Sequence, residues 1–464
     1  MKKIKVGYLP FYIKLYDDKG PQWRVSCVEY MNKLIKMIEK RGIEVVPADE
    51  ICRLKPEFDR AAAKFNADDE ICAVITQHLA YSPSLESIDA LKSLKAPIIV
   101  FDTTPSLELI KYSDTEDRIM DNHGIHGVQD MCNMLKRSGI GYTICAGHVE
   151  NSDVLDRLEG SVRAAYAAAA FRKCRVGMVG GEFEGMGDFR VTDKEYESEI
   201  GTKTIRMTRA EGEKYLAAVT EKEIDAELEY DKKHYDVQVN NAENYRASVK
   251  AGLAVRKWMK AEKLDGVTVN FLHMDTSGLP KVPFVECCKI MGRGQGYAGE
   301  GDNLTAGLVA SLIKAYPDTT FTEMFCPDWR ENTILLSHMG EMNPRLTQDK
   351  PLLYDKPFSY NSCGDTTALS ACFKTGKAVL VNLAPSEWGF TLILSEVDLV
   401  QSGNADRAYV KEVRGWMKPH MPLPQFLKAY SEAGGTHHSA MVYGANVDDL
   451  AAFGEMMGFD VEII

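Results

Sequence analysis

Short apolar segments alternate with helical patterns through the first third of the chain, and this alternation limits the possible folds more than any other feature. Strands are predicted at residues 4–9, 71–75, 97–101 and 142–145. After the first strand, apolar residues recur at three- and four-residue steps, as in an amphipathic helix, at Val25, Val28, Met31, Leu34, Ile35 and Ile38. Strands that alternate with helices predict a doubly wound parallel sheet, which binds ligands beyond the carboxyl ends of its strands.

A second sheet is predicted further along the chain. A long helix is expected after Ser152, a good N-cap, and the strands of the second sheet at residues 174–179, 204–207 and 266–271. The charged segment at residues 211–263 is predicted to be helical, with a solvated face.

Strand-like segments dominate after residue 325, with turn residues between them. They lie at residues 333–339, 378–383, 390–394 and 409–413, and one helix is expected at residues 447–457. The predicted fold class is therefore α/β, with two doubly wound α/β domains followed by a mainly β C-terminal domain. The predicted domains are residues 1–172, 173–325 and 326–464.

Composition and charge exclude several classes of protein. The net charge of −12, without a sustained cluster of Lys and Arg, argues against a nucleic-acid partner. No apolar run approaches the roughly 20 residues that span a bilayer, and the first residues lack the apolar core of a signal peptide. Eleven cysteines without a Cys-x-x-Cys pair indicate reduced thiols. We therefore expect a cytoplasmic protein that binds neither membranes nor nucleic acid.

The segment at residues 294–299 matches the pattern Gly-x-Gly-x-x-Gly. A dinucleotide-binding fingerprint needs a strand before the first glycine and an acidic residue at the end of the next strand. The preceding residues 286–291 are ambiguous, and Asp318 comes before the next predicted strand rather than after it. A flexible turn that presents Glu300 is the better interpretation, although a nucleotide-dependent oxidoreductase stays open as an alternative.

Two carboxylates and two imidazoles stand in short segments that look like parts of one metal site. They are Glu300, Glu323, His338 and His438. This set suits a divalent ion such as Mn²⁺, with positions left open for substrate oxygens.

Each of these residues also has a simpler explanation. Glu300 precedes a helix, where an acid can serve only the helix dipole, and His338 follows an apolar run, where a hydrogen-bonded core histidine is common. Glu323 is predicted to share a strand face with Phe321 and Phe325, where a carboxylate is costly to bury unless it is paired. Adjacent histidines on a strand face opposite ways, so at most one of His437 and His438 is expected to reach a given metal.

Taken in order, these motifs resemble the L-arabinose isomerase family, within the wider group of L-fucose and L-arabinose isomerases. The resemblance rests on the segments at residues 299–302, 321–324, 337–341 and 433–438, and upstream on residues 81–83, 122–127 and 183–192. It implies an aldose–ketose isomerase that binds Mn²⁺ through Glu300, Glu323, His338 and His438. Glu300 and Glu323 would act as the acid/base pair, because isomerisation moves a proton between C1 and C2 of the sugar.

The resemblance also implies further site residues and an assembly. His126, Asp188 and His437 would bind the sugar. The subunits would form homotrimers or homohexamers with sites between subunits, and His126 would then serve the metal site of a neighbour.

Three departures from the family pattern leave the sugar open. They are residues 7–12 at the first strand, residues 324–327 after Glu323, and the chain end at Ile464. The expected reaction is of the L-arabinose to L-ribulose type, and the alternatives are another sugar, such as L-fucose, or a non-catalytic sugar-binding protein.

Overall fold

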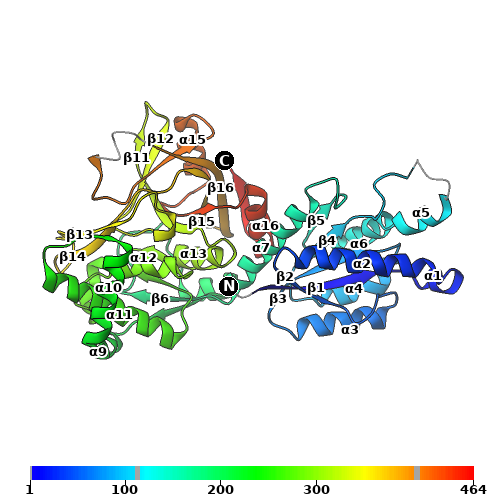
Figure 1. Ribbon diagram of the computed structural model, residues 1–464, viewed down its shortest axis with the longest axis horizontal. Helices are drawn as coiled ribbons and strands as arrows, with labels where there is room; N and C mark the ends of the chain where they lie inside the picture. Colours follow the sequence, from blue (N-terminus) through cyan, green and yellow to red (C-terminus); the bar gives the residue numbers. More distant parts are fainter. Residues whose placement is uncertain (1–2, 110–114, 402–407) are drawn as a thin grey trace. The chain divides into compact units, whose positions relative to one another are not determined.

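The computed structural model describes residues 3–109, 115–401 and 408–464. The chain forms two compact units, Met1–Ala169 and Ala170–Ile464, which are described separately below. Figure 1 labels their helices and strands.

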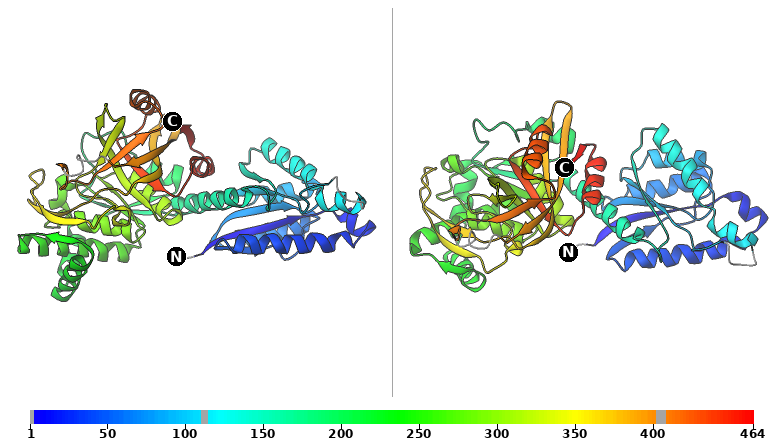
Figure 2. Two further views of the ribbon diagram at one scale, coloured as in Figure 1. Left: turned by 45° about the horizontal axis from the view of Figure 1, so that its top comes forward. Right: turned by 90° about the horizontal axis from the view of Figure 1, so that it is seen from above.

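The first unit is built on a parallel sheet, as the alternation of strands and helices predicts. Its strands lie in the order β2 (Ile43–Pro47), β1 (Ile4–Phe11), β3 (Ile71–His78), β4 (Ile98–Asp102) and β5 (Tyr142–Ala146). Helices lie on both faces of this sheet (Figures 1 and 2). The helices of this part of the chain are α1 (Lys14–Lys19), α2 (Trp23–Glu39), α3 (Lys55–Asn66), α4 (Ser84–Lys92), α5 (Thr115–Asn122), α6 (Ile125–Arg137) and α7 (Val154–Arg172).

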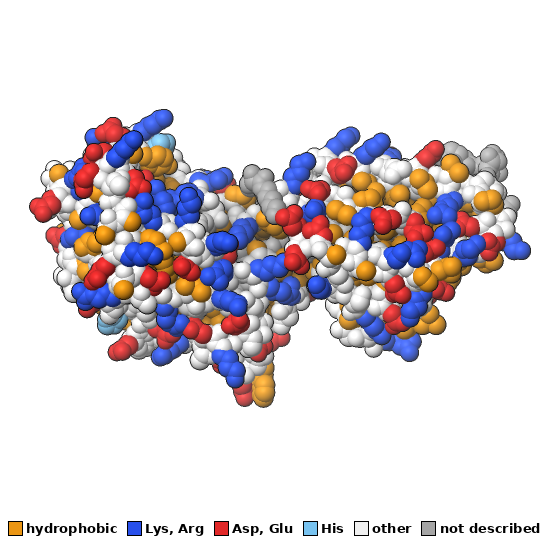
Figure 3. All heavy atoms as spheres, turned by 90° about the horizontal axis from the view of Figure 1, so that it is seen from below, with side chains coloured by type: hydrophobic (Ala, Val, Ile, Leu, Met, Phe, Trp, Pro, Cys, Tyr) orange, Lys and Arg blue, Asp and Glu red, His pale blue; other side chains and the backbone are white. Residues whose placement is uncertain are grey.

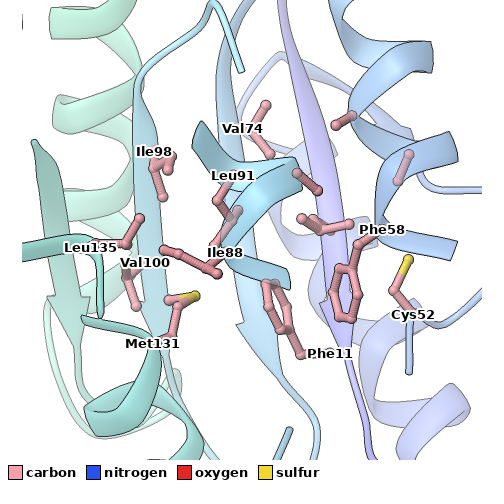
Figure 4. Packing of buried hydrophobic residues seen from close by; sticks show 14 of the residues in the cluster. Phe11, Cys52, Phe58, Val74, Ile88, Leu91, Ile98, Val100, Met131 and Leu135 are labelled. Atoms are coloured by element: carbon pink, nitrogen blue, oxygen red, sulfur yellow. The ribbon is translucent and has the colours of Figure 1, made fainter. Parts of the chain in front are cut away.

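Helices α3, α4 and α6 pack their apolar side chains onto one face of the sheet. Phe58, Ile88 and Met131 meet the strand residues Val74 and Val100 there (Figure 4). Helix α2 joins a separate apolar cluster on a narrower stripe than the sequence predicts, because its buried residues are Cys27, Leu34 and Ile38, whereas Val25 is exposed.

The second unit contains a second parallel sheet, in the order β10 (Gly296–Gly299), β9 (Gly266–Val269), β6 (Arg175–Val179) and β7 (Lys203–Arg206). Helix α13 (Asn303–Ala315) is buried on almost every side. It packs against this sheet and also against strands of the following barrel. A helix that is apolar all round is expected in such an internal position.

A mostly antiparallel sheet follows, as predicted for the C-terminal part. Its order is β15 (Gly376–Ser386), β18 (His438–Tyr443), β11 (Thr319–Asp328), β12 (Thr333–Ser337), β17 (Gly415–Pro419), β16 (Gly389–Val400) and β19 (Asp460–Ile463). Strand β15 also pairs with β16 along its whole length, which closes the sheet into a barrel. The finer division of this unit at residues 325–326 stays a prediction, and β11 runs across that position.

The remaining elements surround these two sheets. A small sheet has the order β14 (Thr366–Ser370), β13 (Leu352–Lys356) and β8 (Asp236–Gln238). The helices are α8 (Asp193–Glu195), α9 (Arg209–Ala217), α10 (Glu221–His234), α11 (Ala242–Glu262), α12 (Phe284–Gly292), α15 (Leu423–Glu432) and α16 (Val447–Met457). The short helical turns are η1 (Tyr196–Ile200), η2 (Phe271–Ser277) and η3 (Pro344–Leu346).

The sequence-based assignment is wrong in one segment and incomplete in another. Residues 409–413 form turns rather than a strand, because Tyr409 and Val410 are exposed and Ser370 Oγ donates hydrogen bonds to the carbonyls of Val410 and Glu412. The charged segment at residues 211–263 is helical as predicted, but α11 also buries one face, including Trp258.

Charged side chains of both signs are interspersed on the face shown in Figure 3. No helix among the described residues combines the length and the apolar composition that crossing a bilayer requires.

Candidate metal centre

Three of the four predicted metal ligands come from neighbouring barrel strands. Glu323 lies in β11 and pairs across the sheet with His438, the first residue of β18, and with Ser337, the last residue of β12. His338 follows Ser337 directly. The strand register therefore brings Glu323, His338 and His438 to one place, although up to 115 residues separate them in the chain.

Glu300 reaches the same place from the central sheet. It follows β10, and its backbone N–H donates to the carbonyl of Val269 at 2.9 Å. Its φ of 62° lies in the left-handed region, which a residue with a side chain seldom adopts. Strained backbone of this kind concentrates at functional sites.

The ligand atoms of these residues form two overlapping groups. Those of Glu323, His338 and His438 lie within 4.8 Å of one another, and so do those of Glu300, His437 and His438. The Nε2 atom of His438 is 3.4 Å from Glu300 Oε2. All four predicted ligands are thus close together, and His437 joins them.

Two further carboxylates hold the imidazole rings from outside. The Nδ1 atom of His438 lies 2.9 Å from Asp302 Oδ2, and that of His338 lies 2.8 Å from Glu341 Oε2. Tyr297 in turn donates its hydroxyl to Glu341 Oε1 at 2.6 Å. Carboxylates in this position orient metal-ligating histidines, because they fix the ring and leave the other nitrogen facing inward.

The inward-facing nitrogen of His438 lacks a hydrogen bond. Its Nε2 atom is buried and has no hydrogen-bond partner among the described residues. A buried polar atom without a partner is costly, and an ion would satisfy it. Together with the two carboxylates and the second imidazole, this atom makes the site a good fit for a divalent cation.

Aromatic and glycine residues shape the walls of the centre. The Phe321 ring meets His338 and His438 edge-on, each at 4.9 Å between ring centroids, and Phe189 stacks on His438 at 5.0 Å. A Cβ at Gly299 would lie 2.6 Å from Cε1 of His338, so this position requires glycine.

The glycine motif at residues 294–299 has no dinucleotide context. Its first glycine follows helix α12 rather than a strand, and its last glycine lies against His338. The fingerprint requires a strand before the first glycine and a helix after it. The simpler interpretation, a turn that leads to Glu300, therefore accounts for the motif.

The predicted neighbourhood of Glu323 is wrong in one respect. Phe321 is buried, but Phe325 is exposed, because the β11–β12 register shifts between Met324 and Cys326. Glu323 therefore has one aromatic neighbour on its face, and the other lies in the bulge.

The two glutamates differ in their electrostatic surroundings. Burial raises the pKa of Glu323 above its usual value, partly opposed by the neighbouring imidazoles. Burial also acts on Glu300, but the neighbouring imidazoles of His437 and His438 outweigh it and hold the pKa of Glu300 well below its usual value. Burial would lower the pKa of His438, yet Asp302 and Glu300 raise it to about 9. The cluster is therefore a strongly coupled set of acids and bases.

His437 also contacts the centre, contrary to the expected alternation along a strand. Its Nε2 atom lies 3.7 Å from Glu300 Oε2, and its ring centroid is 4.3 Å from that of His438. His437 precedes the first residue of β18, so its side chain does not follow the strand alternation. Its Nδ1 atom lies 2.7 Å from Asp188 Oδ2, which places the predicted residue Asp188 beside it.

His126 lies in helix α6 of the first unit. Its ring stacks on Tyr81, with ring centroids 4.8 Å apart, and lies 5.3 Å from the ring of His123. Tyr81 follows strand β3, so this aromatic group stands just beyond the carboxyl end of a parallel strand, where such sheets bind ligands.

Sequence reasoning assigned no role to the supporting residues around the centre, although Asp302 and Glu341 lie within the segments that carry the family resemblance. Asp302 and Glu341 stand two and three residues after Glu300 and His338, so their closeness in sequence to the candidate ligands is the signal that could have assigned them a supporting role. Tyr297 and Phe189 carry no such signal, because their contacts depend on the folded arrangement of separate elements.

Comparison with known families and proteins matches nearly the whole chain. Residues 26–173, 186–316 and 318–460 match the N-terminal, central and C-terminal domains of L-arabinose isomerase. The L-arabinose isomerase of Geobacillus kaustophilus is 26% identical over 422 residues, which cover 88% of this chain and 84% of that protein. That of Oceanobacillus iheyensis is 26% identical over 434 residues, which cover 90% and 88%. The chain therefore belongs to the L-arabinose isomerase family and is an aldose–ketose isomerase.

Proposed function

We propose that this enzyme converts an open-chain aldose into its ketose with a divalent cation, Mn²⁺ being the expected one, held by Glu300, Glu323, His338 and His438. The observation that carries the proposal is the buried Nε2 atom of His438, which has no hydrogen bond and faces two carboxylates. When bound, the cation supplies positive charge that stabilises the negative charge developing on the sugar oxygens.

Glu300 and Glu323 are proposed as the acid/base pair. The reaction moves a proton between C1 and C2 through an enediol, which requires a group that removes the C2 proton and a group that relays protons between the oxygens. The two carboxylates differ in pKa, raised at Glu323 and lowered at Glu300, and such a difference suits separate roles.

His437, Asp188 and His126 are proposed to serve the sugar rather than the cation. His437 is the most exposed of the three histidines at the centre, with about a third of its side chain accessible, so it faces the side from which a substrate approaches. We propose a homotrimer or homohexamer in which His126 completes the site of a neighbouring subunit. The expected cytoplasmic location stays a prediction.

The sugar is proposed to be of the L-arabinose type, because the matched relatives are named L-arabinose isomerase. L-Fucose and other sugars stay alternatives, because residues 7–12 and 324–327 depart from the family pattern near the expected substrate contacts.

The test is isomerisation by the Mn²⁺-loaded protein across a panel of pentoses and 6-deoxyhexoses. At least one aldose should give its ketose, and Glu323→Gln should lower kcat by about 10²–10⁴-fold, because it removes an acid/base group. Glu331→Gln is the matched control, since Glu331 is exposed in the turn after β11. Metal-independent sugar binding without turnover would instead indicate a non-catalytic binding protein.

A further inference from the structure

Three histidines at the centre are held in the same way, although only two of them belong to the proposed ligand set. Each has its Nδ1 atom within 3 Å of a carboxylate oxygen, in the pairs His338–Glu341 (2.8 Å), His438–Asp302 (2.9 Å) and His437–Asp188 (2.7 Å). The third pair needs its own explanation, because neither His437 nor Asp188 is in the proposed ligand set, although His437 also belongs to a group with Glu300 and His438 that could hold an ion.

The Asp188 carboxylate contacts His437 through one of its oxygens. Its Oδ2 atom accepts the backbone N–H of His437 at 2.9 Å as well as the ring Nδ1–H at 2.7 Å. Burial would raise the pKa of Asp188, but these two hydrogen bonds hold it at about 2. A carboxylate only accepts, so His437 Nδ1 must carry the proton, and the ring cannot turn over without losing this bond.

The surroundings make Asp188 the link between two parts of the second unit. The turn before His437 is fixed on the barrel side, where Asn382 Nδ2 donates to Thr436 Oγ1 at 2.6 Å and Tyr430 donates its hydroxyl to the Thr436 carbonyl at 2.6 Å. Asp188 comes from the segment after strand β6 of the central sheet. The next residue, Phe189, packs its ring against the rings of His437 and His438.

The exposure of the three rings separates their roles. His338 and His438 are buried, whereas His437 keeps 32% of its side chain accessible and directs Nε2 toward Glu300 at 3.7 Å. The His437 ring lies at the solvent-exposed side of the centre, and Asp188 fixes its orientation at Nδ1. A side chain held in this way is well placed to bind a ligand that enters from solvent.

We propose that Asp188 is a positioning residue, which orients His437 so that Nε2 hydrogen-bonds a hydroxyl of the bound sugar, and that His437 is not a ligand of the cation. This inference rests on the proposed function, in that a sugar is the substrate. Asp188 then acts on the sugar through the ring and does not touch it.

The test compares Asp188→Asn and His437→Gln with wild-type protein in two readouts. Mn²⁺ affinity and stoichiometry, measured by calorimetry, should stay within about twofold in both variants. In Mn²⁺-loaded enzyme, KM should rise about tenfold or more while kcat changes by less than about threefold, because one hydrogen bond to a charged group contributes roughly that much. Asp193→Asn, an exposed carboxylate five residues away that pairs with Arg206, should change neither.

A third readout does not depend on turnover. In spectra of protein labelled with ¹⁵N-histidine, the ring N–H signal that disappears in His437→Gln should be protected from exchange in wild type and lose that protection in Asp188→Asn. If no sugar is isomerised, the proposed function fails while this signal still decides whether Asp188 holds the ring.

A loss of Mn²⁺ affinity beyond tenfold in His437→Gln would overturn the proposal and make His437 a cation ligand. Unchanged KM together with an unchanged N–H signal in Asp188→Asn would leave Asp188 without the proposed role.

Discussion

Two largely buried clusters of acids and bases among the described residues of the second unit differ in how their charges are paired. One is the metal centre. The other, called here the charge network, alternates in sign along Asp231, Lys289, Glu227, Arg256 and Glu286. In the charge network, Lys289 contacts Asp231 and lies 2.7 Å from Glu227, and Arg256 reaches Glu227 at 2.7 Å and Glu286 at 2.6 Å. Each charge has a partner of opposite sign.

The polar groups of the metal centre have hydrogen-bond partners among the described residues only on the outer side of the centre. Its imidazoles are held at Nδ1, while the buried Nε2 atom of His438 makes no hydrogen bond, and the side-chain carboxylate of Glu323 forms no hydrogen bond or salt bridge with any described residue. Burial costs free energy for polar groups left without partners, so a fold keeps such groups mainly where a ligand completes them. The comparison shows that the pattern of pairing, rather than the presence of buried charge, distinguishes a binding site from a structural cluster.

Breaking the charge network should produce the largest effect on stability. Lys289→Met leaves Asp231 and Glu227 without their shared cation, and the loss of one partner from a buried network costs about 3–5 kcal/mol. Chemical denaturation should show this loss, while kcat of the remaining folded enzyme stays near the wild-type value. Lys232→Met is the control, because Lys232 pairs with Glu229 at the surface and its loss costs about 0–1 kcal/mol. Equal stability of the two variants would contradict the structural role of the charge network.

At the metal centre, pH should act on cation binding. Asp302 and Glu300 raise the pKa of His438 to about 9 against the opposing effect of burial, and a cation can bind Nε2 only after its proton leaves. The apparent Mn²⁺ affinity should therefore rise between pH 7 and pH 9, by up to about tenfold per pH unit for one displaced proton. Calorimetry in two buffers of different ionisation enthalpy measures the released protons. An affinity independent of pH over this range would contradict the release of a proton from His438 when the cation binds.

A smaller effect is expected from the carboxylate behind His338. Glu341→Gln keeps the shape of the side chain but weakens its hold on His338 Nδ1, and changes of this kind typically lower metal affinity about 10–100-fold. Equilibrium dialysis against Mn²⁺ measures the change, and Glu331→Gln again serves as the exposed control. Unchanged affinity would mean that the Glu341–His338 contact is purely structural, like the pairs of the charge network.

The sequence predicts the strands of the first unit well because buried parallel strands are short apolar runs between helices. It predicts the four ligand candidates because each stands in a short motif with glycine or polar neighbours. The failures have physical reasons. Residues 409–413 resemble a strand in composition, but the carbonyl oxygens of Val410 and Glu412 accept hydrogen bonds from the Ser370 hydroxyl instead of from a neighbouring strand. Phe325 leaves the face of Glu323 because of a bulge, which composition does not reveal.

The supporting residues of the centre could be predicted only in part. Asp302 and Glu341 are close in sequence to the residues that they serve, whereas Asp188 lies 249 residues from His437 and Phe189 packs on rings from another sheet. Contacts of this range follow from how the central sheet and the barrel pack, which a single sequence does not show.

The most direct test of the central claim is the binding of Mn²⁺ to metal-free protein, measured by calorimetry for wild type and for His438→Gln. We expect one Mn²⁺ per chain in wild type and an affinity at least about 100-fold lower in His438→Gln, because the variant loses a ligand that Asp302 holds in place. Circular dichroism should confirm that the variant is folded. Equal affinity and stoichiometry in the two proteins would contradict the assignment of this cluster as the metal centre.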